Sequence, residues 1–176
     1  MTYLEKESRL IEAMNRDNFS KFDGDKDMAY DMLERCFDSF PDYANTVIRM
    51  QTMVPIWSQR YDGQELRDRI QDIDQTRRIK HDGAISSLGI LNRLSTMHGL
   101  EPFADVDTSD RYAVADFVGR FVSETYADGT HTSMDALVKD HPRQEFPKGQ
   151  IRSRIADLDA KFGDIIDKED KGPEYE

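Results

Sequence analysis

A long proline-free stretch from Asp62 to Gly99 constrains the fold more than any other part of the chain. Its apolar residues recur every three or four positions, which is the spacing of one face of an α-helix. We therefore predict one helix over residues 62–98, with about 36 residues at ~1.5 Å per residue. Asp62 is expected to cap its start with a side-chain oxygen, and Gly99 to end it in a left-handed conformation.

One stripe of this helix is expected to face the core. It is apolar at both ends and polar in the middle, where Arg77 and His81 stand. A polar pair on a core-facing stripe needs either a chemical or a structural explanation. The stripe consists of Ile70, Ile73, Arg77, His81, Ala84, Leu88, Leu91 and Ser95.

The rest of the chain is also helical in pattern. Pro41 is expected to separate two helices, because the residue before a proline avoids helical geometry. Pro55 is expected to kink or break the second of them near Val54. Thr108 or Ser109 is expected to cap a later helix. The further predicted helices are 3–17, 26–38, 42–60, 108–127, a short one at 132–139, and 149–168.

These elements predict an all-α fold, a helical bundle built around the long central helix. We expect a bundle domain at 1–140, a linker at 141–148, and a C-terminal amphipathic helix with a frayed end at 149–176. The tail helix has a narrow apolar stripe that either the bundle or a second chain must cover. The linker favours a second chain, paired helix to helix. The stripe consists of Ile151, Ile155, Leu158, Phe162 and Ile165.

Composition argues against several classes of function. The net charge of -11 disfavours nucleic acid as a partner, because phosphate binding needs clustered Lys and Arg. The lone Cys36 cannot form an internal disulfide, which fits a reducing cytoplasm. No apolar window reaches the ~18 residues of a membrane span, and the charged N-terminus does not resemble a secretory signal. We expect a cytoplasmic protein with no membrane partner.

An acidic segment at the start of helix 26–38 matches part of the calcium-loop pattern of EF-hand proteins. Met28 stands at the sixth position, where the sharp turn requires glycine. The alternative is an acidic helix start, which the helix dipole favours. We prefer that alternative and predict no metal site and no cofactor. The weak candidate ligands are Asp23, Asp25, Asp27, Asp31 and Glu34.

The segment around His81 is the main candidate for chemistry. Arg77 precedes it, Asp82 follows it, and small residues lie beyond, which loosely resembles the phospho-accepting histidine of four-helix phosphotransfer modules. Those modules place Lys and Gly three and four residues later, where this chain has Ala84 and Ile85. The His-Asp pair also resembles metal-dependent phosphohydrolases of the HD type, which need further ligands. No histidine precedes His81.

A structural explanation competes with the chemical one. Arg77 and His81 can form a buried polar layer that a carboxylate from another helix satisfies. Gly83 and Gly89 would then let two helices of the bundle approach closely.

Asp116 is a candidate for that carboxylate. It can pair with Arg120, one helical turn later, or turn inward to Arg77 or His81. Further polar candidates for the same layer are Asn92, Asp110 and Arg111.

The pattern HD-x-AI…LNR…G-x-x-P…DRY-x-VADF, carried by His81–Phe117, resembles a family of small, uncharacterised all-helical proteins from Gram-positive bacteria. The resemblance implies a helical fold and a bacterial cytosolic setting. It implies no activity.

No complete catalytic set is recognisable, so we predict a non-enzymatic protein–protein interaction or scaffold module that forms a homodimer through helix faces. The alternative is a phospho-accepting or metal-assisted phosphohydrolase-like site centred on His81. Its other catalytic candidates are Arg77, Asp82 and Asp116. Burial of His81 against a carboxylate would argue against this alternative.

Overall fold

The computed structural model describes residues 1–19, 25–128 and 150–163. Within these ranges the chain forms helices and no strand, so the predicted all-α fold is confirmed. The predicted short helix at 132–139 and the linker at 141–148 lie outside the described residues, so the proposed domain division stays a prediction. The helices are α1 (Tyr3–Arg16), α2 (Lys26–Arg60), α3 (Gly63–Met97), α4 (Arg111–Asp128) and α6 (Gln150–Phe162).

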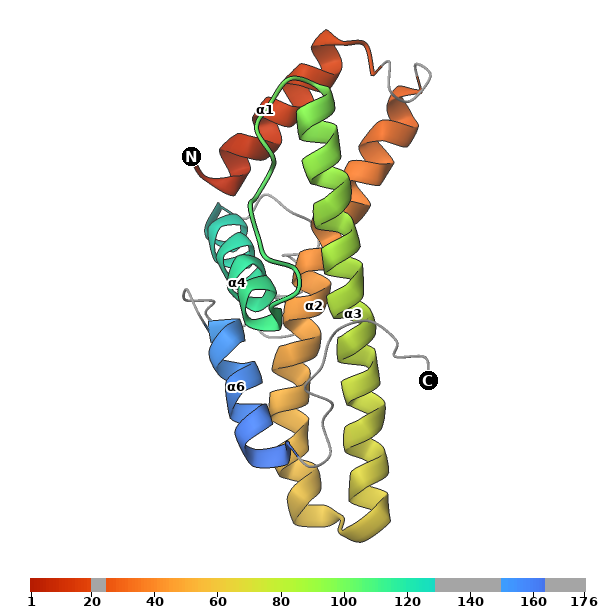
Figure 1. The fold of residues 1–176 in the computed structure, drawn as a ribbon. Coiled ribbons are helices and arrows are strands. Elements are labelled where there is room, and N and C mark those ends of the chain that lie inside the picture. Colours follow the sequence, from red (N-terminus) through yellow and green to blue (C-terminus); the bar gives the residue numbers. More distant parts are fainter. Residues whose placement is uncertain (20–24, 129–149, 164–176) are drawn as a thin grey trace.

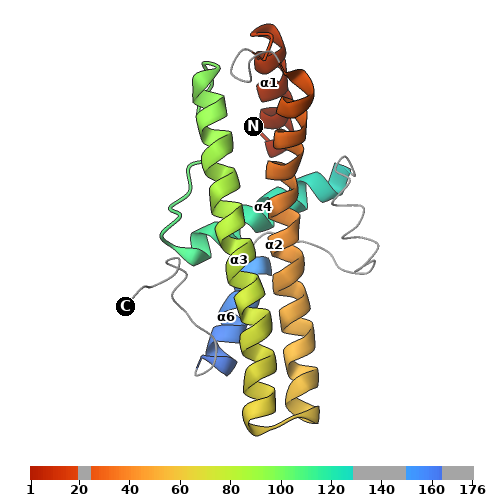
Figure 2. The same ribbon diagram turned by 90° about the vertical axis from the view of Figure 1, so that its right-hand side faces the viewer.

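Two long helices form the frame of the bundle. α2 and α3 each have 35 residues and run antiparallel, side by side (Figures 1 and 2). α4 crosses this hairpin and packs on α2, and α6 packs on both α2 and α4. α1 packs on α4 near the end of the hairpin where α3 finishes (Figure 1). None of the described helices is long and apolar enough to cross a membrane.

The predicted central helix is confirmed. α3 ends where expected, with Gly99 at φ +80°. The Gly99 N–H donates to the Thr96 carbonyl at 3.2 Å, and the Leu100 N–H donates to the Ser95 carbonyl at 2.8 Å. These are the two bonds of a Schellman motif, which satisfies carbonyls that a helix end leaves without partners. The start differs in detail, because Asp62 occupies the N-cap position but its side chain makes no capping hydrogen bond.

The predicted break at Pro41 is wrong. Residues 26–60 form one continuous helix, with Pro41 and Pro55 both inside it. Each proline removes one backbone donor, so the carbonyls of Phe37 and Gln51 lose their usual partners. Burial offsets this cost, because an unbroken helix keeps one continuous apolar stripe against α3 and α4. That stripe includes Phe37, Phe40, Ala44, Val47, Met50 and Val54.

α4 begins later in the chain than the sequence predicts. Neither Thr108 nor Ser109 caps it; the helix begins at Arg111, and Asp110 accepts the backbone N–H of Tyr112 at 2.9 Å. This is the geometry of an N-cap carboxylate. The predicted apolar face of this helix is confirmed, because all five of its members are buried: Val114, Phe117, Val118, Phe121 and Val122.

The tail helix packs on its own chain. α6 lies against α2 and α4, and Ile151, Ile155 and Leu158 are buried there. The expectation that a second chain covers this stripe is therefore not met for these residues. The apolar pattern required a cover, and the facing surfaces of α2 and α4 supply it within one chain.

Candidate functional site

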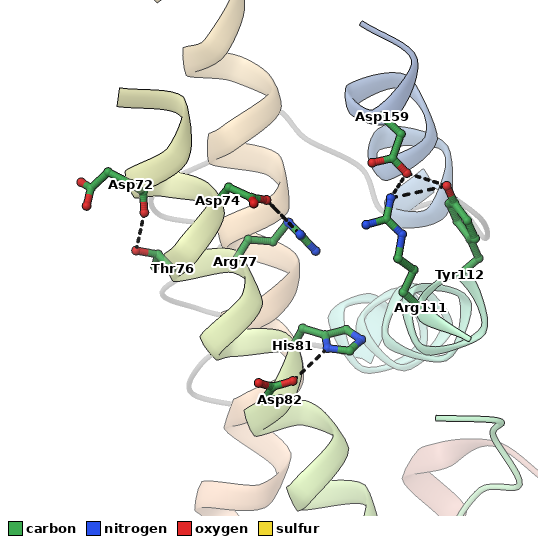
Figure 3. Close-up of polar contacts among 9 residues, drawn as sticks. All are labelled: Asp72, Asp74, Thr76, Arg77, His81, Asp82, Arg111, Tyr112 and Asp159. Carbon is green, nitrogen blue, oxygen red and sulfur yellow. Dashed lines mark hydrogen bonds and ion pairs between the residues drawn. The ribbon is translucent and has the colours of Figure 1, made fainter. Parts of the chain in front are cut away.

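The polar middle of α3 separates two apolar clusters of the core. The larger cluster joins α1, α2, α4 and the last part of α3, where Ala84 and Leu88 lie. The smaller cluster contains Met50, Val54, Ile70 and Leu158. Between them α3 carries a set of buried polar residues that we call the polar layer (Figure 3). Its members are Asp74, Arg77 and His81.

Arg77 is paired with a carboxylate of its own helix. Its Nε and Nη2 both lie 2.9 Å from Asp74 Oδ1. Arg77 is 1% exposed and Asp74 is 3% exposed, so the pair is held away from water. A buried ion pair of this kind is costly to break, because removing one partner leaves the other charge poorly compensated. The predicted buried layer therefore exists, and α3 itself supplies a carboxylate to it, that of Asp74.

Sequence reasoning missed Asp74. Its position did carry a signal, because it stands four residues after Ile70 and three before Arg77, which places it on the inward stripe. The neighbouring Ile73, which was assigned to that stripe, is only half-buried.

His81 is fully buried, with 0% of its surface exposed. Its Nδ1 lies 3.3 Å from Asp82 Oδ1, and its ring lies 5.8 Å from the ring of Tyr43 on α2. Because an ionised carboxylate only accepts, this contact favours the tautomer with the proton on Nδ1. No polar atom of the described residues lies within hydrogen-bond reach of Nε2. A phospho-accepting histidine must present a ring nitrogen to a partner, and this ring presents neither.

The four catalytic candidates do not form one site. Arg77 and His81 share the polar layer, whereas the Asp82 side chain is half exposed on the outer side of α3. Asp116 accepts from Arg152 of α6 at 2.8 Å and pairs with neither Arg77 nor His81. It therefore ties α4 to α6.

The other polar candidates also have structural partners outside the polar layer. Arg111 of α4 forms an ion pair with Asp159 of α6, and the Tyr112 hydroxyl donates to the same carboxylate at 2.5 Å (Figure 3). Asn92 exchanges two hydrogen bonds of 3.0 Å with the backbone of Ala104. These contacts fix α6 and the loop after α3 to the bundle.

The acidic segment begins a helix. Asp25 is the N-cap of α2 and accepts the backbone N–H of Met28 at 3.0 Å. Asp27 lies in the first turn, and Asp31 pairs with Arg35 at 3.1 Å. Glu34 is exposed one turn further along the helix, while Asp23 lies outside the described residues. Within the described ranges, no group of three or more His, Cys, Asp or Glu side chains could hold a metal ion.

Two surface grooves lie near the N-terminus of α1. One, of about 290 Å³, runs between Arg9 and the loop at Glu101. The other, of about 350 Å³, includes Asp116 and Arg120. Neither is lined by a residue of the polar layer, so neither leads to His81.

A second buried histidine joins the ends of α1 and α3. His98 is 3% exposed, and its Nδ1 lies 2.6 Å from Oδ2 of Asp17, the C-cap of α1. Arg16 donates to the His98 carbonyl at 3.3 Å. The hydrogen bond from His98 is the main cause that lowers the pKa of Asp17 below its ordinary value of 3.8, and Arg16 adds to the effect.

The Asp17 contact makes stability depend on acid pH. A carboxylate whose pKa is lowered by folding stabilises the protein above its unfolded pKa, and this contribution is lost as pH falls through the folded pKa. We therefore expect Asp17→Asn to lower the melting temperature at about pH 6.5, with a difference from wild type that shrinks below about pH 4. Thermal melts followed by circular dichroism across this range test it. A difference that stays constant into acid would show that the carboxylate charge is not responsible.

A family model matches residues 2–131, which include α1 to α4 and the whole polar layer. The chain belongs to the family described as "Protein of unknown function (DUF3232)". The sequence-based recognition of an uncharacterised helical family is thereby confirmed, whereas the Gram-positive origin stays a prediction. Comparisons with curated proteins and with solved structures gave no match. In this DUF3232 chain, α6 follows the matched region and packs on two of its helices.

Proposed function

We propose that this chain acts as a non-enzymatic protein–protein interaction module that forms a homodimer through a helix face. The observation that carries the proposal is the burial of the polar layer. The residues best suited to chemistry, Arg77 and His81, are 1% and 0% exposed and lie between two apolar clusters. Their placement serves the packing of α2 against α3 and offers no contact to a substrate.

The remaining candidates support the same conclusion. Asp116 forms a contact between α4 and α6, and Asp82, next to His81, is half exposed at the edge of the buried stripe. The alternative function, a phospho-accepting or hydrolytic site at His81, requires these groups to meet around one accessible atom. It also requires α3 to move away from α2, because the His81 ring packs near Tyr43.

Sedimentation equilibrium of the full chain tests the proposal. We expect a mass about twice the 20.4 kDa of one chain at micromolar concentrations, dissociating on dilution. A single species of monomer mass up to the highest soluble concentration would contradict it. A matched assay tests the alternative function. After incubation with a small phosphoryl donor, we expect the wild-type chain to carry no acid-labile phosphate above the level found in the His81→Gln variant.

A further inference from the structure

The outer face of α3, opposite its buried stripe, carries exposed apolar side chains. Ile79 is 61% exposed and Met97 is 51% exposed. They stand five helical turns apart at ~3.6 residues per turn, so they lie on one line along the helix. Ser86 is exposed between them on the same face. Single exposed apolar residues are common on protein surfaces, so this pair indicates a docking surface only together with the other features of the same face.

Two glycines flank this line, and among the described residues no other side chain packs against either of them. A Cβ added at Gly83 or at Gly89 would meet nothing within 4 Å. The prediction that they let two helices of the bundle approach closely is therefore wrong. Each glycine costs roughly 1 kcal/mol relative to alanine inside a helix. Glycine at these two positions would let a helix of another chain approach α3 closely, which would account for this cost.

The charges on this face complement those on the same face of a second, antiparallel copy of the chain. Asp82 is half exposed and Arg93 is exposed, and among the described residues no carboxylate pairs with Arg93. The two lie about three helical turns apart on the same side of α3. In an antiparallel pair related by a twofold axis, residues equidistant from the axis face each other. A twofold axis level with the midpoint between Ser87 and Leu88 brings Asp82 opposite Arg93 of the partner subunit. The symmetry repeats this contact, so the interface contains the pair twice.

The same axis aligns the rest of the face. Ser86 comes opposite Gly89 of the partner subunit, where small side chains allow close approach. Ile79 comes opposite the position directly before Met97 of the partner subunit. The first half of α3 extends past the end of the partner's helix, so Asp72 stays outside the contact. Because each chain has a net charge of -11, association needs local complementarity of this kind.

We propose that a second copy of this chain docks antiparallel on the outer face of α3, about a twofold axis level with Ser87 and Leu88. This deepens the proposed function, since it rests on self-association and names the surface and the geometry. The three observations that carry it are the exposed apolar pair, the open glycines and the self-complementary charges.

Charge reversal tests the pairing in sedimentation equilibrium of the full chain. Asp82→Arg and Arg93→Asp should each weaken the dimer roughly tenfold or more, because each places like charges opposite one another at two symmetric positions. The double variant Asp82→Arg/Arg93→Asp should restore the dimer. Asp72→Arg changes the net charge as Asp82→Arg does, on the same face but outside the contact, and should leave the dimer unchanged.

Gly89→Leu provides a test that does not depend on charge. The space around Gly89 is open within the chain, so the variant should melt no lower than wild type while its dimer is weakened at least as strongly. A wild-type dimer that neither Gly89→Leu nor the reversals weaken would overturn this surface and leave the proposed function standing. Weakening by each reversal without rescue by the double variant would overturn the antiparallel pairing. A monomeric wild type would overturn both proposals.

Discussion

Replacement of Arg77 by alanine is expected to lower the free energy of unfolding by about 3–5 kcal/mol. The guanidinium and Asp74 Oδ1 are 2.9 Å apart, and both side chains are almost completely buried. Without Arg77, the Asp74 carboxylate loses its nearby cation in a place that water hardly reaches. The truncation also leaves a void between two apolar clusters, which adds to the loss.

Urea unfolding followed by circular dichroism measures this effect. Arg35→Ala is the matched control, because Arg35 also pairs with an aspartate of its own helix but is 80% exposed. Exposed pairs of this kind contribute about 0.3–0.5 kcal/mol. An Arg77→Ala variant no less stable than Arg35→Ala would show that the buried pair contributes nothing special.

A double replacement separates charge from packing. In Asp74→Leu/Arg77→Met, both charges of this pair are removed and much of the volume is kept, so stability should recover most of what Arg77→Ala loses. A double variant as unstable as the single one would instead place the loss in packing. The polar layer would still matter for register, because a slip of α3 along α2 by one turn carries Arg77 into an apolar cluster.

The sequence predicted α3 well because two independent signals agreed there. The apolar spacing and the terminal Gly99 both come from local geometry, and tertiary packing did not oppose either of them. α2 was different. The rule that a helix stops before proline is local, and it predicted a boundary at Pro41 that the packing of Phe37 and Phe40 on α4 overrides.

The partners of the polar residues were harder to predict. The pattern identified Arg77 and His81 as inward-facing, since inward position depends only on helical spacing. It could not identify what Asp116 contacts, because that depends on how α6 lies across α4. For the same reason, the sequence could not predict which surface packs on the apolar stripe of the tail helix. A narrow apolar stripe has the same pattern whether its own bundle or a second chain covers it.

Replacement of Phe121 by alanine should also cost about 3–5 kcal/mol, for a purely apolar reason. Phe121 on α4 is fully buried, and its ring centre lies 4.8 Å from that of Phe40 in an edge-to-face arrangement. It stacks on Phe37 at 6.0 Å. Aromatic pairs of this geometry add about 0.5–1.5 kcal/mol beyond the area they bury. Among the described residues, Phe121 also contacts the rings of Tyr3, Phe103 and Phe117.

Phe121 therefore connects α4 to α1, to α2 and to the loop after α3, and its loss should weaken these three contacts together. Urea unfolding should show a lower midpoint with an unchanged slope, since the variant still unfolds in one step. Phe121→Leu keeps most of the apolar volume and should lose less than half as much. Ile56→Ala, on a 40% exposed side chain of α2, should cost below about 1 kcal/mol. A Phe121→Ala variant no less stable than Ile56→Ala would mean that the aromatic cluster does not hold α4 to the hairpin.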